Sequence, residues 1–449
     1  MHVNSAVERH AAKRAALAAS LREGTGEVAL AKDTSNLFRD RAGGARRRLD
    51  VRAFNEVLRI DCEAGFVEAE GMIPYEALVA ECLAHGVMPA VVPQLKTITL
   101  GGAVAGVGIE ASSQRYGLVH ETVEELDVLA ADGSVLACTP ANEHADLFFG
   151  FPNSYGTLGY ALRVKARTAP VKKYVRLEHL PFERPDFLFA ELERRLAARD
   201  ADFIDGTAFG PEELYLTLGR FTDSAPQVSD YGYEHIYYRS IRDKREDWLT
   251  ASDFIWRWDT DWFWCSKNLL AQNPLVRRLY GRARLGSKTY TRLMRWNSRV
   301  GLTRVLDRLR GLHSESVIQD VDVPLARAGE FFDFYASEIG IWPQWICPVG
   351  AQPDAERFAL YPMRQGWYVN FGFWDVLRTR EAHEHGHFNR MIEEEVVALG
   401  GIKSLYSDSF FPEAEFRRLY GGEAYARLKA KYDPQGVFPD LYAKCVLRR

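Results

Sequence analysis

The sequence has few cysteines and no long hydrophobic run. Its 449 residues include six cysteines, and no two of them form a Cys-x-x-Cys pair. A disulfide framework, a zinc ribbon and a thioredoxin-type redox centre are therefore not expected. No stretch reaches the roughly 20 apolar residues of a membrane span, and charges spread through residues 6–22 interrupt the apolar core that a signal peptide needs. We expect a cytoplasmic protein with reduced thiols.

A strong overall charge is also missing. The formal net charge is −4, with 26% charged and 47% hydrophobic residues. This balance is typical of a soluble globular protein and carries no global sign of nucleic-acid binding. The length exceeds that of one ordinary core and predicts two domains.

Common catalytic motifs are scarce. The sequence has no P-loop and no Gly-x-Ser-x-Gly elbow between a strand and a helix. Residues 383–387, His-Glu-His-Gly-His, formally match the zinc-protease pattern His-Glu-x-x-His. Gly386 weakens the helix that this pattern requires, and no third ligand follows at a recognised spacing. We expect a solvated, histidine-rich helix start and no metal site.

What the sequence does contain is a glycine-rich stretch at residues 97–117. Gly101, Gly102, Gly106 and Gly108 would let the backbone adopt positive φ and bring its N–H groups close to phosphate oxygens. Residues 106–111 also fit the Rossmann fingerprint, but residues 123–139 read as a strand, an Asp-Gly turn and a second strand. A hairpin in this place argues against a Rossmann unit. A purely structural turn stays an alternative.

Motifs dispersed along the chain carry a family resemblance. They lie at residues 99–118, 131–140, 146–148, 156–159, 170–176, 317–320, 341–348 and 405–408. Together they resemble the flavin-binding domain of the vanillyl-alcohol-oxidase (PCMH) superfamily, and within it the Δ24-sterol reductase (DIMINUTO/seladin) branch. The resemblance implies an α+β fold with two domains.

Four segments follow from this resemblance. Residues 1–24 form an N-terminal helix, and residues 25–170 form the PCMH-type FAD-binding domain. Residues 171–404 form a substrate (cap) domain built on an antiparallel sheet, and residues 405–449 return to the flavin. The branch's eukaryotic members carry an N-terminal membrane anchor that this sequence does not show. An anchorless bacterial-type homologue is therefore expected.

The resemblance also implies the residues that hold FAD. They are Thr34, Ser35, Asn36, Thr99, Leu100, Gly101, Gly102, Gly106, Gly108, Ile109, Glu110, Ser112, Ser113, Gly117, Gly156, Thr157 and Gly159. Many family members have a histidine in the first pyrophosphate loop that bonds covalently to the flavin. None of residues 31–39 is a histidine, so we expect non-covalent FAD. For residues 32–36, a solvated turn is the alternative.

Candidate catalytic groups come from three later segments. Sugar-oxidising relatives have a lysine beside the aspartate of the 405–408 motif, and Ser407 takes its place here, which makes alcohol oxidation unlikely by resemblance. We expect Tyr406, paired with Asp408, to act as a proton donor. The alternation of strands 342–348 and 366–374 presents Cys347 and Asn370 as pocket candidates. Packing or a structural hydrogen bond would also explain these residues.

A basic, aromatic stretch stands out at residues 262–310. It has twelve lysines and arginines against one acid, Asp307, with tryptophans and leucines between them. This pattern is typical of an interfacial membrane element. Nucleic acid is a weaker reading because no recognition fold accompanies the charge. A solvated basic face stays open.

The combined prediction is an FAD-dependent reductase of an isolated, branched carbon–carbon double bond. The substrate would be a lipid, such as a sterol or isoprenoid side chain or a methylene-branched fatty acyl chain. Tyr406 would supply a proton, flavin N5 a hydride, and NADPH would be a transient donor. Two alternatives stay open: a flavin-dependent dehydrogenase or oxidase running in the opposite direction, and a membrane-surface binding protein with a vestigial flavin fold. The oligomeric state cannot be inferred from the sequence.

Overall fold

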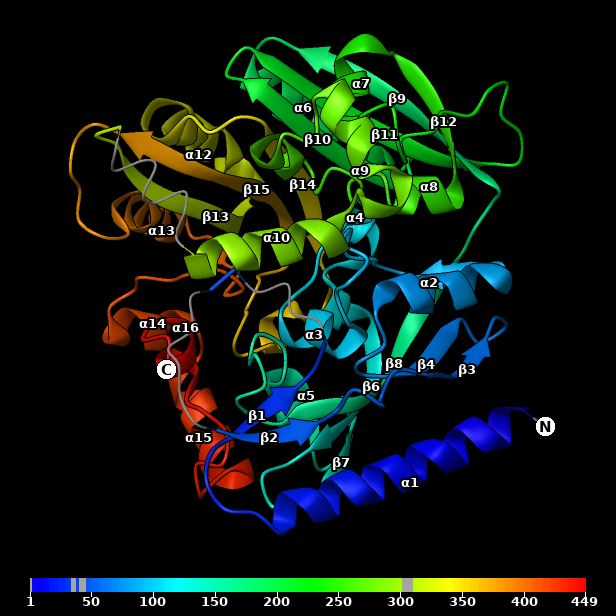
Figure 1. Cartoon of the computed structure of the whole chain (residues 1–449), viewed down its shortest axis with the longest axis vertical. Coiled ribbons are helices and arrows are strands. Elements are labelled where there is room, and N and C mark those ends of the chain that lie inside the picture. Colours follow the sequence, from blue (N-terminus) through cyan, green and yellow to red (C-terminus); the bar gives the residue numbers. More distant parts are fainter. Residues whose placement is uncertain (1, 34–37, 40–45, 301–309) are drawn as a thin grey trace.

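Two antiparallel sheets organise the chain, as the computed structural model shows (Figure 1). The structure describes residues 2–33, 38–39, 46–300 and 310–449. One sheet has six strands and takes them all from residues 57–170, and the other has eight strands from residues 174–403. Antiparallel pairing throughout both sheets, combined with helices packed beside them, gives the predicted α+β architecture.

The six-stranded sheet has the order β3-β4-β8-β6-β7, with β5 paired to the far end of β8. The predicted hairpin is present, because β6 and β7 pair around the Asp132-Gly133 turn. The bounds are β3 Val57–Asp61, β4 Phe66–Glu70, β5 Val87–Pro89, β6 Val123–Leu129, β7 Val135–Cys138 and β8 Tyr160–Pro170, with helices α2 Tyr75–Ala84, α3 Leu100–Ala105, α4 Ser113–Tyr116, η1 Val119–Thr122 and α5 Ala145–Gly150.

The eight-stranded sheet has the order β12-β9-β11-β10-β14-β15-β13-β16. Its strands are β9 Tyr174–Phe182, β10 Phe203–Gly210, β11 Glu213–Thr222, β12 Glu246–Thr250, β13 His313–Pro324, β14 Gln344–Ala351, β15 Gly366–Thr379 and β16 Ile402–Lys403. Its helices are α6 Pro185–Ala198, α7 Tyr237–Asp243, α8 Ala251–Ile255, η2 Cys265–Leu269, α9 Pro274–Tyr280, η3 Arg282–Arg284, α10 Ser287–Val300, η4 Leu325–Arg327, α12 Ala328–Phe334, η5 Tyr335–Ile339, η6 Ala355–Arg357 and α13 His387–Ala398.

The two ends of the chain flank the six-stranded sheet (Figure 1). Helix α1, His2–Arg22, confirms the expected N-terminal helix, and a short parallel pair follows it, β1 Val28–Ala31 with β2 Arg47–Asp50. Helices α14 Glu413–Leu419, α15 Gly422–Tyr432 and α16 Leu441–Cys445 end the chain. Among the described residues, no helix is both long and apolar enough for a membrane span. All six cysteines are free thiols.

Alternation along β14 and β15 separates two cores. Trp345 and Cys347 belong to the core shared with the six-stranded sheet, whereas Ile346 packs on the opposite face against α6 and α12. Val369 and Phe371 of β15 likewise point away from Asn370. One face of this sheet is therefore covered by helices, and the other faces the six-stranded sheet.

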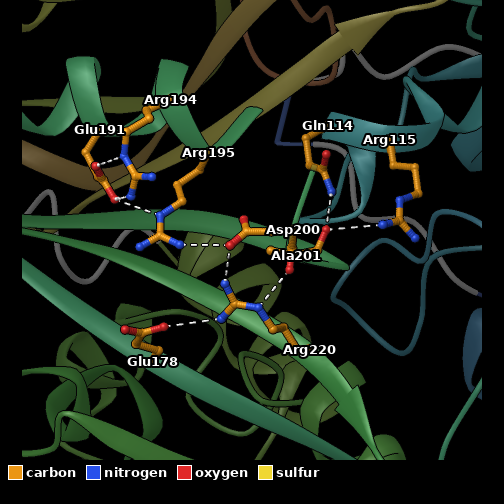
Figure 2. A network of polar contacts seen from close by, with 9 residues as sticks. All are labelled: Gln114, Arg115, Glu178, Glu191, Arg194, Arg195, Asp200, Ala201 and Arg220. Atoms are coloured by element: carbon orange, nitrogen blue, oxygen red, sulfur yellow. Dashed lines mark hydrogen bonds and ion pairs between the residues drawn. The ribbon is translucent and has the colours of Figure 1, made fainter. Parts of the chain in front are cut away.

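A polar network fastens α4 to the eight-stranded sheet (Figure 2). The side chain of Gln114 on α4 donates to the carbonyl of Ala201 at 3.3 Å, in the turn before β10. The neighbouring Asp200 accepts from Arg195 of α6 at 2.9 Å and from Arg220 of β11 at 2.8 Å. The first contact joins α4 to the turn before β10, and the other two hold that turn against α6 and β11.

Candidate functional site

A cavity of about 570 Å³ lies between the two sheets. This volume is in the range of small-molecule and cofactor sites. Its lining comes from β1, from the glycine-rich stretch around α3 and from the start of β8 on one side, and from β13, β14 and β15 on the other. Residues near the end of the chain, Lys444, Arg448 and Arg449, complete the wall.

The glycine-rich stretch, which the sequence predicts to hold the cofactor, forms part of this wall. The predicted cofactor residues that line the cavity are Thr99, Gly101, Gly102, Gly106, Gly108, Ile109, Gly156 and Gly159. Their local structure differs from the prediction, because residues 100–105 form the short helix α3, capped by the Thr99 hydroxyl at 3.3 Å from the Gly102 nitrogen.

The reason for these glycines also differs. Gly101, Gly102, Gly106 and Gly108 do not have positive φ. A larger residue would not fit at these positions, because other parts of the chain pack closely against them. A Cβ on Gly101 would lie 2.9 Å from the Gly71 carbonyl oxygen, and one on Gly108 would lie 2.8 Å from Pro93. Positive φ is instead found at Gly156 and Gly159.

The structure places six other predicted cofactor residues outside the described lining: Leu100, Glu110, Ser112, Ser113, Gly117 and Thr157. They have structural contacts instead. The Ser112 and Thr157 hydroxyls donate to backbone carbonyls, and the Ser113 hydroxyl accepts from the Glu110 backbone nitrogen. Leu100 is in the core. Thr34, Ser35 and Asn36 lie outside the described residues.

Glu110 belongs to a buried ion cluster behind the cavity wall. The Arg257 guanidinium donates to Glu110 at 2.9 Å and to Asp205 of β10 at 2.8 Å. Asp205 also accepts from the indole of Trp345, which lines the cavity. Gly117, at φ 74°, lies against the Glu121 carboxylate. Glu110 and Gly117 therefore lie behind the cavity wall and do not face the cavity.

Backbone strain is concentrated around the cavity. Eight described residues other than glycine have positive φ, and five of them line the cavity: Val107, Tyr155, Trp262, Phe263 and Arg448. Trp262 and Phe263 are consecutive, at φ 45° and 58°. Bulky side chains rarely adopt this conformation, and such strain gathers at functional sites.

One part of the cavity wall is strongly basic. Lys32, Arg39, Arg46, Arg48, Lys444, Arg448 and Arg449 line it, from both ends of the chain. The Arg39 guanidinium lies 4.6 Å from the centre of the Tyr155 ring, and Arg46 donates to Glu27 at 2.8 Å. This excess of cations suits the diphosphate of a dinucleotide cofactor.

Another part of the wall is aromatic and carries a chain of hydrogen bonds. The Trp374 indole of β15 donates to the Tyr406 hydroxyl at 2.7 Å, and the Tyr406 hydroxyl donates to the Asp320 carboxylate of β13. Burial raises the pKa of Asp320 to about 8, with a further increase from Asp322. Burial and the Asp320 charge raise the pKa of Tyr406 well above its usual value. Both groups therefore hold a proton at neutral pH.

Asn370, a predicted pocket residue, lines the cavity beside this chain. Its amide donates to Asp322 at 2.9 Å, and Tyr361 donates to the same carboxylate at 2.6 Å. Burial raises the pKa of Asp322 to about 6. Three polar atoms in the wall have no hydrogen-bond partner among the residues that the structure describes, namely Asn370 Oδ1, Asp320 Oδ1 and Gln94 Nε2. Donors and acceptors of this kind match the polar edge of an isoalloxazine ring.

Two predicted catalytic residues lie elsewhere. Cys347 is buried, and its thiol contacts the Glu110 carbonyl oxygen at 3.3 Å. Asp408 lies 3.5 Å from the Arg448 guanidinium, and neither Asp408 nor Cys347 is among the described residues that line the cavity. The predicted pairing of Tyr406 with Asp408 is therefore corrected, because Asp320 is the carboxylate that accepts from Tyr406.

Sequence reasoning missed Asp320, Asp322 and Trp374. Asp320 and Asp322 are two residues apart on β13, so both face the cavity. The available signal was an Asp-x-Asp pattern within residues 317–324, where most other side chains are apolar, since carboxylates are rarely buried unless they are paired.

The two motifs that competed with the flavin site have other roles. Helix α13 begins at His387, after Gly386 at φ 80°, so residues 383–387 do not form one helical turn. Within the part of the chain that the structure describes, no group of three or more potential ligands could hold a metal ion. The basic stretch is partly internal, because Trp262, Phe263, Trp264 and Arg277 are buried.

Comparisons with known proteins support an FAD-binding fold. Residues 11–139 match the family described as "FAD binding domain". The chain is 26% identical to Delta(24)-sterol reductase of Homo sapiens over 411 residues, which cover 87% of this chain and 76% of the relative. It is 25% identical to the Arabidopsis thaliana protein of the same name over 434 residues, covering 88% and 76%. Cytokinin dehydrogenase 2 of Oryza sativa subsp. japonica is 27% identical over 165 residues, covering 37% and 27%. These findings confirm the predicted resemblance, the FAD-binding fold and the FAD cofactor.

Proposed function

We propose that this FAD-dependent oxidoreductase, which resembles the Δ24-sterol reductases along most of its length, reduces an isolated, branched carbon–carbon double bond in a lipid. The substrate is a sterol or isoprenoid side chain or a methylene-branched fatty acyl chain. The observation that carries the proposal is the Trp374–Tyr406–Asp320 chain, a source of protons in the aromatic wall of the cavity.

The residues that line the cavity fit FAD. The basic wall, with Arg39, Arg46 and Arg48, would hold the diphosphate, and Asn370 and Gln94 would meet the polar edge of the ring. When bound and reduced, FAD supplies a hydride.

The protein's own contribution is a proton and a dry environment. An isolated alkene has no carbonyl to accept electron density, so a proton must reach the less substituted carbon as the hydride reaches the branched one. Tyr406 donates this proton from its hydroxyl. Asp320, protonated at neutral pH, then returns a proton to Tyr406. Trp345, Trp374 and Phe263 exclude water, which would otherwise trap positive charge at the branched carbon.

Reoxidation of the reduced protein tests the direction of the reaction. The holoprotein is reduced anaerobically with NADPH and then mixed with a branched-alkene lipid or with oxygen, while flavin absorbance is followed. We expect the alkene to reoxidise the flavin and to gain two hydrogen atoms by mass spectrometry. Reoxidation by oxygen alone would support the dehydrogenase or oxidase reading instead.

A single substitution tests the proton donor. Tyr406→Phe should still accept electrons from the donor but should lose alkene turnover by about 100-fold or more. The matched control is Tyr442→Phe, because the Tyr442 hydroxyl donates to the Phe411 carbonyl at 3.5 Å and Tyr442 is not among the described residues that line the cavity. Unchanged alkene turnover in Tyr406→Phe would remove Tyr406 from the mechanism.

A further inference from the structure

Exposed apolar side chains gather in one segment. Among the described side chains, eight large hydrophobic residues are exposed to solvent, and four of them lie between residues 270 and 296. They are Leu270 at 69%, Leu275 at 71%, Leu279 at 80% and Trp296 at 55% exposure. The other four are scattered along the chain. A cluster of this kind marks an interaction surface.

Helix α9 is built to present leucines outward. Leu275 and Leu279 are one helical turn apart and share a face. Arg277, between them in sequence, points inward and forms a buried ion pair with Asp261 at 2.6 Å. Asn273 caps the helix start. The exposure of the two leucines therefore belongs to an anchored helix.

Helix α10 lies beside this element and is anchored as well. The Tyr280 and Tyr290 rings meet at 6.5 Å between centroids, and Ser287 donates to the buried Asp259 at 2.5 Å. Figure 1 shows α10 passing in front of the level where the two sheets meet. Lys288 on α10 pairs with Glu76 of α2, which ties it to the six-stranded sheet.

The positive charge of residues 262–300 favours an anionic partner. Residues 262–300 contain no acidic residue. Exposed cations, including Arg278, Arg284 and Arg292, accompany the exposed leucines and Trp296. Apolar side chains framed by cations match a bilayer with anionic headgroups, where leucine and tryptophan enter the interface and arginine contacts phosphate.

The same segment begins in the wall of the cavity. Trp262 and Phe263 line it, and the Phe263 ring lies 4.2 Å from the Trp374 ring. Only seven residues further along the chain, Leu270 is on the surface. The exposed leucines and the aromatic end of the cavity are thus parts of one continuous stretch.

We propose that residues 270–296 dock this protein onto the surface of an anionic lipid bilayer, with Leu270, Leu275, Leu279 and Trp296 entering the interface. Docking in this way brings the aromatic end of the cavity to the membrane, so that a lipid reaches it without crossing water. The delivery of substrate rests on the proposed function, whereas docking does not.

Vesicle cosedimentation of the FAD-loaded full chain tests the docking. The probes are vesicles of phosphatidylglycerol with phosphatidylethanolamine and, separately, vesicles of phosphatidylcholine. We expect binding to the anionic vesicles that weakens in high salt. The double variant Leu275→Glu/Leu279→Glu should bind at least tenfold more weakly. Both side chains are exposed, so flavin absorbance and thermal unfolding should match wild type.

Phe187→Glu on α6 is the matched control, because Phe187 is similarly exposed outside the segment. It should bind vesicles as wild type does. Docking is overturned if wild type does not cosediment with anionic vesicles, or if the double variant binds equally well. It is also overturned if light scattering shows a dimer that the double variant dissociates, because a second copy would then cover the leucines.

A further readout separates docking from the reaction. Turnover of a detergent-dispersed alkene should be the same in wild type and the double variant, while turnover of the same lipid in anionic vesicles should fall with binding. If no alkene is turned over in either form, the proposed function fails and the cosedimentation result still decides the docking.

Discussion

At the scale of residues, Asp320 is the unusual group. It lines the cavity, its Oδ1 has no hydrogen-bond partner within the described part of the chain, and burial raises its pKa to about 8. A raised carboxyl pKa means that the folded protein binds the proton more tightly than the unfolded chain does. The contribution of Asp320 to stability is then greatest at low pH and falls as pH rises from about 4 towards 8. Asp320 thus weakens the fold at the pH where it would serve catalysis, a trade-off common at active sites.

The direction of this pH dependence gives a prediction for the stability of Asp320→Asn. The amide cannot ionise, so the variant should unfold at a temperature about 2 °C or more above wild type at pH 8, with the difference shrinking towards pH 5. Alkene turnover of wild type should fall as pH rises through about 8, and the variant should have little turnover at any pH. Differential scanning calorimetry and a pH profile of turnover provide the measurements. A variant less stable than wild type at pH 8 would contradict the assignment.

At the scale of elements, the pairing of β13 with β15 creates the proton chain. Asp320 lies directly opposite Gly372, and Trp374 is two residues further along β15 on the same face. A Cβ on Gly372 would lie 2.7 Å from the Asp320 carboxylate and 2.5 Å from the Trp374 ring. The glycine therefore makes the room in which the carboxylate and the indole sit side by side.

Gly372→Ala should displace the Trp374 ring and break its hydrogen bond to Tyr406. We expect a stability loss of about 1–3 kcal/mol, as for other overpacked sites, and at least a tenfold loss of alkene turnover. Chemical denaturation and steady-state kinetics measure these effects. Gly210→Ala, also a strand glycine but with open space around its Cβ, is the control and should be close to wild type in both. Equal behaviour of the two variants would show that the room beside Asp320 is not needed.

The sequence could predict features that depend on a short continuous motif, but not features that depend on the pairing of distant strands. Tyr406 and the glycine-rich stretch could be found because their signals lie in short continuous motifs. The role of Asp320 could not, because it depends on a strand register that joins distant parts of the chain. The glycines were found for the wrong reason, since their close neighbours are Gly71 and Pro93, which packing alone brings near. The hairpin and the faces of β14 and β15 were predictable because alternation is a local property.

At the scale of the whole molecule, the candidate cofactor site lies between the two sheets. Its wall takes residues from β1 near the start of the chain and from β15 near the end. The described residues that line it include no histidine and no cysteine. We therefore expect FAD to be held by charge, hydrogen bonds and stacking contacts.

Acid precipitation tests this form of binding. Denaturation should release all of the FAD, because no covalent bond retains it, and the washed pellet should be colourless while the supernatant shows the flavin absorbance. A flavoprotein with covalently bound FAD serves as the control and should give a yellow pellet. Yellow colour in the pellet of this protein would contradict the expectation drawn from residues 31–39.

The contact between Phe38 and Tyr406 has a consequence for biosynthesis. The Phe38 nitrogen donates to the Tyr406 carbonyl at 3.0 Å, and residues 444–449 close the same wall beside β1. A nascent chain on the ribosome would possess the glycine-rich stretch long before it possesses this closing piece. Tight capture of FAD should therefore wait until residues 444–449 have been translated, and polypeptides that terminate before them should leave the ribosome without their cofactor.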